Sequence, residues 1–387
     1  RGADPGGNEE RNRPCMGGRV GVQAAPGGEP LDSRLDREGR DVPRHGRSGV
    51  ADELAIDQIA QSLGYLGHDG PQRRDWRGAG GRCDFRVSLS RTSAAPSADQ
   101  TAKTLAYLVP VGKGLILDLF DGEDWVPRRI KYDPDSANQR DVVPTDLAVM
   151  TTTTVPYDLF VRWRGGRAET KLVAWASATA RTGASIAAPW LHESGLGMHE
   201  GILCRADGSA GAAAAGRLDP YWRYVATLYP SASGQCEDSI AKRLVSNALN
   251  REWRYMSVVD TTNTWTYNTA AWRQANASAA NQVAFVLGLA GVAVAADVLG
   301  MYYAGTGSFC QVGIGLDSTT VNSAQIVQGE HSDGNARGVF GKYDGCPSIG
   351  YHYLAWLEIV NGTTTWVGDL GGTYGPMQSG LRARVLA

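Results

Sequence analysis

The residues of this chain that could do chemistry begin with a serine and a lysine three positions apart. Ser239 and Lys242 match the S-x-x-K spacing of serine acyl-enzymes, which needs the lysine one helical turn from the nucleophile. Neither S-D-N nor K-T-G follows, and Ser239 or Asp238 is equally suited to cap a helix. Helix capping is therefore the preferred interpretation, with a catalytic serine as the alternative.

Two histidines with neighbouring carboxylates are the candidate metal ligands. The segment LHESGLGMHEG contains His192, Glu193, His199 and Glu200, and imidazoles with carboxylates can hold a divalent metal. The seven-residue spacing crosses a glycine-rich stretch, so nothing in the pattern brings the four side chains together. The six cysteines are far apart and include no C-x-x-C pair, which argues against a zinc site. We expect a solvated loop here, and no metal or cofactor in the chain.

Four carboxylates are candidates for acid–base chemistry. Glycan-cleaving enzymes use two acids about 5–9 Å apart, and Glu237, Asp238, Asp317 and Glu358 are available for such a pair. The sequence cannot place them in space, and it lacks the internal repeats of long β-helical depolymerases. It also contains no phosphate-binding, nucleophile-elbow or zincin motif. We therefore predict a protein that is not an enzyme, with no catalytic residues, and keep glycan cleavage as the alternative.

Aromatic side chains are the candidates for ligand contact. They could stack on sugar rings as in lectins, but their alternating positions favour core packing; they are Trp265, Tyr267, Trp272, Tyr351, Tyr353 and Trp356. Asn276 and Asn361 begin formal glycosylation sequons, which carry no weight without secretion. We therefore assign no ligand-binding residue.

Composition bounds the class of protein. The chain has 387 residues, 42% hydrophobic and 20% charged, with a net charge of −2. Such a balance is typical of a globular protein of two or three domains. Nothing global attracts nucleic acid or an anionic membrane, so neither is an expected partner.

The elements that must position these residues begin after a change of composition near residue 86. Residues 1–85 are crowded with Gly, Pro, Arg and Asp, with one amphipathic stretch at Val50–Leu66, and we predict a disordered or non-native upstream segment. The rest is predicted to be mainly β, with antiparallel β-sandwich or jelly-roll-like domains joined by one α-helix. The predicted divisions are a proximal β-rich domain (86–235), a linker helix (236–256) and a distal jelly-roll-like sandwich (257–387).

Three turn signals lie between β-prone runs. Asp121-Gly122, Gly165-Gly166 and Asn361-Gly362 supply residues that tolerate positive φ, which type I′ hairpin turns require. Each predicts a β-hairpin, and Asn361-Gly362 is the strongest of the three signals.

Periodicity adds one strand and one helix. Alternation gives residues 351–359 a wholly apolar face at the odd positions and a mixed face at His352, Trp356 and Glu358. In the segment CEDSIAKRLVSNALNREW a helical stripe predicts the linker helix, which Asn250 would end; the stripe consists of Ile240, Leu244, Val245, Ala248 and Leu249.

The longest apolar run, Val283–Tyr303, approaches the length of a membrane span. Asp297 lies inside it, where a charge near the centre of a spanning helix costs about 2.5–3.5 kcal/mol. No basic cluster flanks it, and Gly288, Gly291 and Gly300 divide it into strand-length pieces. We predict two buried strands, and the alternative is a membrane-anchored surface protein.

Residues 86–387 resemble a family of tailed-bacteriophage and prophage tail or virion structural proteins of the tail-fibre-like kind. The stretches that carry the resemblance are VSLSRTSAAPSADQTAKTLAYLVPVGKGLILDLFDGEDWVPRRI, YDLFVRW, LVAWASATAR, RYVATLYPSASGQCEDSIAKRLVSNALNREWRYMSVVDTTNTWTYNTAAWRQANASAANQ, VGIGLDSTTVNSAQI and SIGYHYLAWLEIVNGTTTW.

The resemblance implies a non-enzymatic virion component, assembled in the bacterial cytoplasm, with other virion proteins as partners. It further implies a homo-oligomer, with a trimer typical of phage fibres, and a distal sandwich that contacts a host receptor or surface glycan. It supplies no catalytic residues to carry over to this chain.

Overall fold

A computed structural model describes residues 81–135, 143–181, 195–206, 218–371 and 377–387. The upstream segment predicted for residues 1–85, with its amphipathic stretch Val50–Leu66, lies outside the described residues except for its last five positions. Those positions already belong to the fold, since Cys83 bridges to Leu117 and Phe85 begins a strand. The described fold therefore includes residues just before Arg86.

Strands dominate the described residues, which confirms the predicted mainly β fold class. The helical elements within the described ranges are two 3-10 turns, η2 (Leu147–Val149) and η3 (Ala275–Ala277). Among the residues that the structure describes, all strand pairings are antiparallel except that of β14 (Lys242–Arg243) with β19 (Gln282–Leu287).

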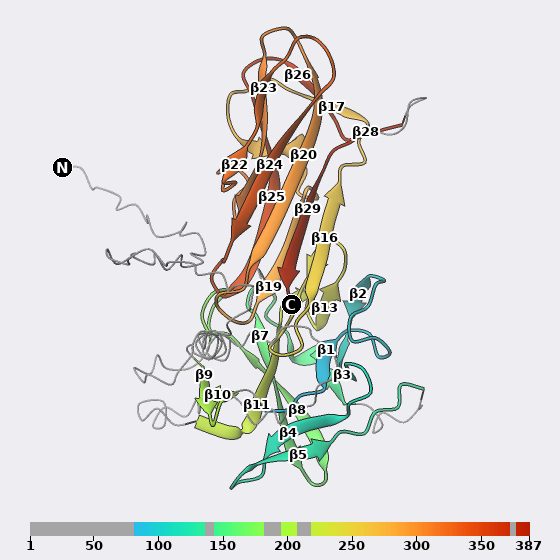
Figure 1. Cartoon of the computed structure of the whole chain (residues 1–387), viewed down its shortest axis with the longest axis vertical. Coiled ribbons are helices and arrows are strands. Elements are labelled where there is room, and N and C mark those ends of the chain that lie inside the picture. Colours follow the sequence, from blue (N-terminus) through green and yellow to red (C-terminus); the bar gives the residue numbers. More distant parts are fainter. Residues whose placement is uncertain (1–80, 136–142, 182–194, 207–217, 372–376) are drawn as a thin grey trace, which may run out of the picture. The chain divides into compact units, whose positions relative to one another are not determined.

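The first half of the described chain forms three small sheets, of which Figure 1 shows the strands. Their orders are β1-β3-β6, β4-β5 and β8-β7-β11-β10-β9 with β15 beside β11. The strands are β1 (Phe85–Ser88), β3 (Leu105–Pro110), β4 (Ile116–Phe120), β5 (Trp125–Arg129), β6 (Pro144–Asp146), β7 (Tyr157–Arg164), β8 (Arg167–Ala174), β9 (Leu196–His199), β10 (Ile202–Ala206), β11 (Leu218–Leu228) and β15 (Val245–Asn247).

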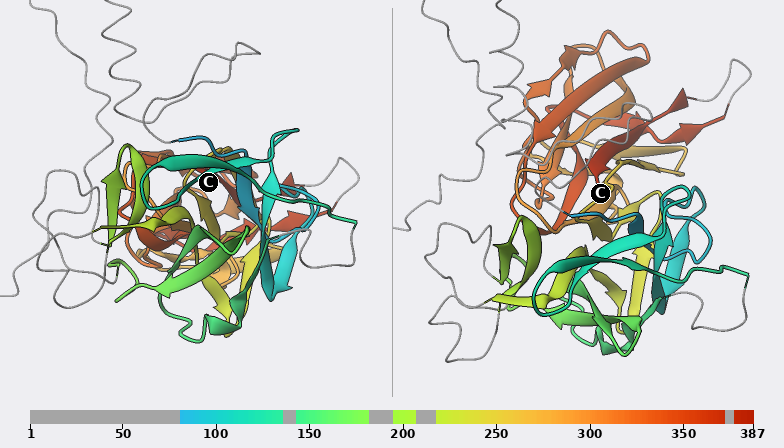
Figure 2. Two further views of the ribbon diagram at one scale, coloured as in Figure 1. Left: turned by 90° about the horizontal axis from the view of Figure 1, so that it is seen from below. Right: turned by 60° about the horizontal axis from the view of Figure 1, so that its bottom comes forward.

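Two larger sheets pack face to face as a sandwich (Figures 1 and 2). The first, called here the β25 sheet, has the order β12-β13-β14-β19-β25-β21-β23, with β2 beside β13 and β18 beside β25. Its remaining strands are β2 (Gln100–Lys103), β12 (Pro230–Ala232), β13 (Gln235–Asp238), β18 (Arg273–Gln274), β21 (Phe309–Leu316), β23 (Gly329–His331) and β25 (Gly350–Val360).

The second, called here the β20 sheet, has the order β16-β29-β20-β24-β22, with β26 beside β20 and β17 beside β26. Its strands are β16 (Trp253–Val259), β17 (Thr264–Tyr267), β20 (Val294–Ala304), β22 (Ile326–Val327), β24 (Arg337–Gly345), β26 (Thr364–Val367) and β29 (Gly380–Leu386). A short ladder of β27 (Asp369–Leu370) and β28 (Met377–Gln378) stands apart.

The sandwich core forms because alternate residues of both sheets point inward. In β20, Val294, Ala296 and Val298 are buried, while Asp297 and Leu299 are exposed. This period of two is the pattern of a sheet with one buried face. A second buried cluster gathers residues from β1, β3, β4, β7 and β11. The described chain thus has one core between the two large sheets, a second among the earlier strands, and a smaller third cluster that includes Phe160 and Tyr224.

Two of the predicted hairpins are confirmed. Gly165 and Gly166 join β7 to β8 with φ of 58° and 80°, and Arg164 pairs with Arg167 across the turn. β4 and β5 also form a hairpin, although its loop has four residues, because Phe120 pairs with Trp125. Glycine is required at these turns because positive φ is strained for other residues.

The hairpin predicted at Asn361-Gly362 is wrong. The strand before it, β25, belongs to one sheet, and the strand after it, β26, pairs with β17 and β20 in the other. Neither Asn361 nor Gly362 has positive φ. Instead, Oδ1 of Asn361 accepts a hydrogen bond from the backbone N–H of Phe309 at 2.5 Å. The two residues therefore connect a strand of one sheet of the sandwich to a strand of the other sheet.

The linker helix predicted for residues 236–256 is also wrong. The segment contains β13, β14, β15 and the first residues of β16. Its apolar stripe is only partly buried, since Leu244 and Val245 pack inside whereas Ile240 is 44% exposed. Extended backbone lets the segment pair with β2, β11, β19 and β29, and such long-range pairing overrides local helix propensity.

The mixed face of β25 points into the sandwich core. Leu354, Trp356 and Val360 belong to the sandwich core, and Glu358 on the same side is 0% exposed. Tyr353 and Ile359 on the other side are half-buried. Glu358 can face inward because its hydrogen-bond donors Trp265 and Asn276 lie beside it.

The apolar run Val283–Tyr303 forms two strands, β19 and β20, as predicted. Among the described residues, no helix is long and apolar enough to span a membrane.

Candidate functional site

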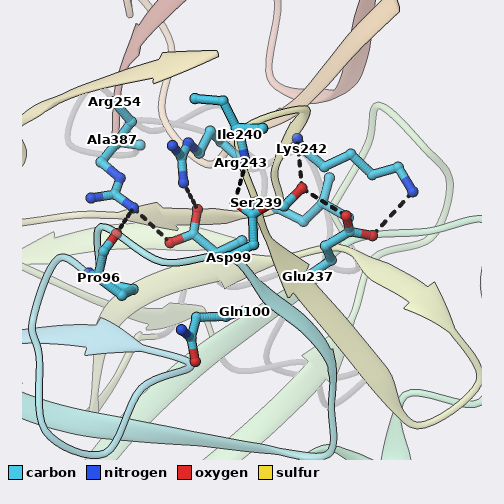
Figure 3. A network of polar contacts seen from close by, with 12 residues as sticks. Pro96, Asp99, Gln100, Glu237, Ser239, Ile240, Lys242, Arg243, Arg254 and Ala387 are labelled. Carbon is cyan, nitrogen blue, oxygen red and sulfur yellow. Dashed lines mark hydrogen bonds and ion pairs between the residues drawn. The ribbon is translucent and has the colours of Figure 1, made fainter. Parts of the chain in front are cut away.

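A polar network surrounds Asp238 where β13, β14 and β16 meet. Figure 3 labels its two arginines, Arg243 and Arg254. Arg243 Nη1 donates to Asp238 Oδ1 at 2.9 Å, and Arg254 Nη2 donates to Asp238 Oδ2 at 3.1 Å. Arg254 also donates to the carbonyl of Pro96, and Arg243 to that of Tyr255. Asp238 and both arginines are buried. Each charge is thus paired within the chain, and the network connects three separate segments.

The S-x-x-K residues lie beside this network in the β13–β14 turn (Figure 3). Ser239 Oγ donates to Glu237 Oε1 at 2.7 Å, and Lys242 Nζ binds Glu237 Oε2 at 3.0 Å. The serine contacts the backbone N–H of Lys242 rather than its amine. Asp99 receives the N–H of Ile240 at 2.7 Å. The helical turn that an S-x-x-K mechanism needs is absent here, and both side chains stabilise the turn.

Glu358 is the most deeply buried carboxylate among the sequence candidates. It receives hydrogen bonds from Trp265 Nε1 at 2.8 Å, Arg273 Nε at 2.7 Å and the backbone N–H of Asn276 at 3.2 Å. Burial raises the pKa of Glu358, although the Trp265 hydrogen bond and the charge of Arg273 act in the opposite direction. Arg273 also lies 3.8 Å from the ring centroid of Tyr267.

A neighbouring group, not predicted from the sequence, centres on Asp260. Its Oδ2 receives the Nδ2 groups of Asn276 at 3.1 Å and Asn281 at 2.5 Å. Asn276 adopts φ of 53°, a conformation that asparagine tolerates better than most residues. The amide of the first sequon is therefore engaged inside the fold.

Asp317 pairs with His352. His352 Nδ1 lies 2.8 Å from Asp317 Oδ2, and His352 Nε2 lies 2.7 Å from the carbonyl of Ser348. Both ring nitrogens are thus engaged, which leaves neither to activate a nucleophile.

Asp317 and Glu358, one pair of carboxylates that glycan cleavage could use, are not brought together. Asp317 binds the backbone of Tyr353, five residues from Glu358 along the same strand. At about 3.3 Å per residue, the backbone positions of Tyr353 and Glu358 are roughly 17 Å apart. The two carboxyl groups of a glycosidase are about 5–9.5 Å apart.

His199, for which the sequence predicted a solvated loop, is the last residue of β9 and is half-buried. Its Nδ1 accepts a hydrogen bond from Trp125 Nε1 at 3.2 Å, and its ring packs against Phe120. Tyr221 joins the same aromatic group, which the sequence did not predict. His192 and Glu193 lie outside the described residues. Within the described ranges, no three His, Cys, Asp or Glu side chains are close enough to hold a metal.

Core packing is confirmed for three of the candidate aromatics. Trp265, Tyr267 and Trp356 are buried in the sandwich core. Tyr351 is half-buried and stacks on Tyr229, with ring centroids 4.2 Å apart; Trp272 and Tyr353 are also half-buried.

A small cavity of about 100 Å³ opens beside β7 and β8. Asp158 lines it and is bound by Arg181 Nε at 2.7 Å and Thr227 Oγ1 at 2.6 Å. Trp175 also lines it, and its Nε1 is buried without a hydrogen-bond partner. The volume suits a few water molecules rather than a substrate.

Comparison with known proteins adds little to this geometry. No protein-family model matches the chain, and no curated protein matches it either. Solved structures with some likeness include the insecticidal delta-endotoxin Cry8Ea1 from Bacillus thuringiensis, with 5% identity and a TM-score of 0.20 over 80% of this chain and 53% of that one.

Two further structures are similarly distant. A Cry1Da tryptic core variant from Bacillus thuringiensis has 7% identity and a TM-score of 0.16 over 74% of this chain and 48% of that one. The infectious bursal disease virus Gx strain structure has 10% identity and a TM-score of 0.17, with coverages of 83% and 72%. The chain thus spans about half the length of the two toxins, and scores this low carry no functional argument.

Proposed function

We propose that the chain is a non-enzymatic structural component of a tailed-phage virion, a tail or fibre subunit that self-associates and binds other virion proteins. The proposal that the chain is not an enzyme rests on one observation: each candidate catalytic carboxylate is already bound by another group of the same chain. Glu237, Asp238, Asp317 and Glu358 each bind a cation, a histidine or a backbone group of the same chain. Side chains held in this way support a fold rather than a reaction.

The phage context rests on the resemblance of residues 86–387 to tail-fibre-like proteins. A mainly β architecture with buried polar networks suits a protein that must persist outside the cell. In this proposal the sandwich is the part displayed toward a host receptor or surface glycan, and the location is the virion after assembly in the bacterial cytoplasm.

Mass spectrometry of gradient-purified particles tests this proposal. Particles from an induced lysogen that carries the gene should contain peptides from the described ranges at the abundance of a structural protein. The matched control is the same gradient fraction from a strain with the gene deleted. Complete particles without these peptides would exclude a virion role.

Two alternatives remain and are separable from the main proposal. A glycan-cleaving tail protein would also be found in particles but would release reducing ends from polysaccharide. A membrane-anchored bacterial surface protein would sediment with membranes and need detergent for extraction, whereas the proposed subunit stays in the supernatant.

A further inference from the structure

The outer face of the β20 sheet carries an unusual share of exposed apolar side chains. Of the eleven large apolar side chains that are exposed among the described residues, six lie on strands of this sheet. They are Trp253, Tyr255, Val259, Leu299, Ile326 and Phe340. Apolar side chains gathered on one face mark an interaction site more often than scattered single residues do.

Strand register arranges part of this surface in a row. Val259 pairs with Gly380, Gly380 with Leu299, and Leu299 with Phe340, so the row crosses β16, β29, β20 and β24 (Figure 1). Val259, Leu299 and Phe340 are 43%, 46% and 41% exposed. Because Gly380 has no side chain, the row contains a gap between two apolar side chains.

The adjacent row alternates in charge. Arg382 pairs with Asp297, and Asp297 with Lys342, which gives positive, negative and positive positions on β29, β20 and β24. Asp297 and Arg382 are exposed. An apolar row beside a row of alternating charge can match a second copy of itself.

We propose that this face binds the same face of a second copy, about a two-fold axis that runs along the strands midway between β29 and β20. The inference rests on the proposed self-association and names the surface for it. The axis places β20 against β29 of the partner and β24 against β16 of the partner. Leu299 then fills the gap at Gly380 of the partner subunit, and Phe340 covers Val259 of the partner subunit. Asp297 faces Arg382 of the partner subunit, and every contact occurs twice.

Other positions of the axis fit less well. An axis on β20 itself sets Asp297 against its own copy and Arg382 against Lys342 of the partner subunit, and like charges so placed repel. An axis midway between β20 and β24 leaves Val259 beyond the edge of the partner sheet. The proposed axis covers all three apolar side chains of the row and pairs Asp297 with Arg382 of the partner subunit, while Lys342 faces Ser257 of the partner subunit.

Light scattering of the full chain at micromolar concentration tests the contact. The unmodified protein should show the mass of two chains, and Leu299→Glu or Phe340→Glu should reduce it to one. Val321→Glu is the matched control, because Val321 is 62% exposed and lies outside the β20 sheet. Circular dichroism checks that each variant is folded. A monomeric or trimeric unmodified protein would overturn the proposal, as would a dimer that Leu299→Glu leaves intact.

A mixing experiment separates contact between copies from contact within one chain. Asp297→Arg alone and Arg382→Asp alone each place like charges across the axis, so each variant should be at least tenfold weaker as a dimer. An equimolar mixture restores opposite charges at both sites, while the charges within each chain remain unchanged. Recovery of dimer in the mixture is expected, and no recovery would contradict the axis. A monomeric protein that is still found in particles would remove both this inference and the proposed self-association and would keep the virion role, whereas a trimer in particles would remove this inference alone.

Discussion

Asp238 and Glu358 are both buried carboxylates held by arginine, yet they differ in where their partners come from. Asp238 is bound by residues 5 and 16 positions away. Glu358 is bound by residues 93, 85 and 82 positions away, which the sandwich brings beside it. Both sites join the two large sheets, because Asp238 and Arg254 lie on β13 and β16, and Glu358 and Trp265 lie on β25 and β17. They differ in sequence distance, since the arginines that bind Asp238 follow it within 16 residues. A charged residue in a strand can therefore be an inward residue whose partners are remote in sequence.

The largest expected effect is at Asp238. Asp238→Asn removes the carboxylate that neutralises two buried arginines, and breaking a buried pair in this way costs about 3–5 kcal/mol. Urea unfolding followed by tryptophan fluorescence measures the loss. Glu252→Gln is the matched control, because Glu252 also pairs with Arg254 but is 44% exposed, and it should cost less than about 1 kcal/mol. Equal losses for the two variants would contradict the larger stabilising role of the buried Asp238 carboxylate.

A smaller loss is expected at Glu358. Glu358→Gln leaves Arg273 without its charge partner, but the Arg273 side chain is 30% exposed and water compensates in part. We expect a loss of about 2–3 kcal/mol in the free energy of unfolding. Asp344→Asn, on the exposed side of β24, is the control and should be nearly neutral. A larger loss in the free energy of unfolding for Glu358→Gln than for Asp238→Asn would contradict this expectation.

The Trp265 hydrogen bond is expected to contribute less than either charge pair. A double-mutant cycle of Trp265→Phe with Glu358→Gln should give a coupling of about 1–2 kcal/mol. The same cycle with Trp356→Phe is the control, because Nε1 of Trp356 has no hydrogen-bond partner. Its coupling should be close to zero. Equal couplings would mean that ring packing, rather than the hydrogen bond, connects Trp265 to Glu358.

The smallest effect is a dependence on pH. Because the pKa of Glu358 is raised in the folded state, the protonated carboxyl is favoured there relative to the unfolded chain. The resulting stability is present below the pKa of an unfolded glutamate and is lost as pH rises through the folded pKa. Between pH 4 and pH 7 the unmodified protein should therefore lose stability relative to Glu358→Gln. A gain over this range would contradict the direction of the shift.

The same contrast between local and remote partners explains what the sequence could predict. The Gly165-Gly166 hairpin is a local event, and positive φ at both residues is enough to specify it. Val283–Tyr303 was predicted as two strands because its glycines and Asp297 are inconsistent with a single long apolar helix. Trp265, Tyr267 and Trp356 were predicted as core from alternation, which reports directly on burial.

The errors arise where remote partners decide the structure. Asn361-Gly362 has the composition of a hairpin turn, but β26 pairs with β20, whose sequence lies 60 residues earlier. The stripe at Ile240, Leu244 and Ala248 fits a helix, but neighbouring strands supply the backbone hydrogen bonds. No sequence signal gives the partners of Glu358, because Trp265, Arg273 and Asn276 meet it only after the sheets have paired.

The central claim is that these carboxylates hold the fold and perform no hydrolysis. The direct test is to incubate the full chain with polysaccharide extracted from the bacterium whose genome carries the gene, and to measure released reducing ends between pH 4 and pH 8. We predict no release above that of the heat-denatured protein at any pH. Release that Glu358→Gln or Asp238→Asn abolishes, in variants that remain folded, would contradict the account.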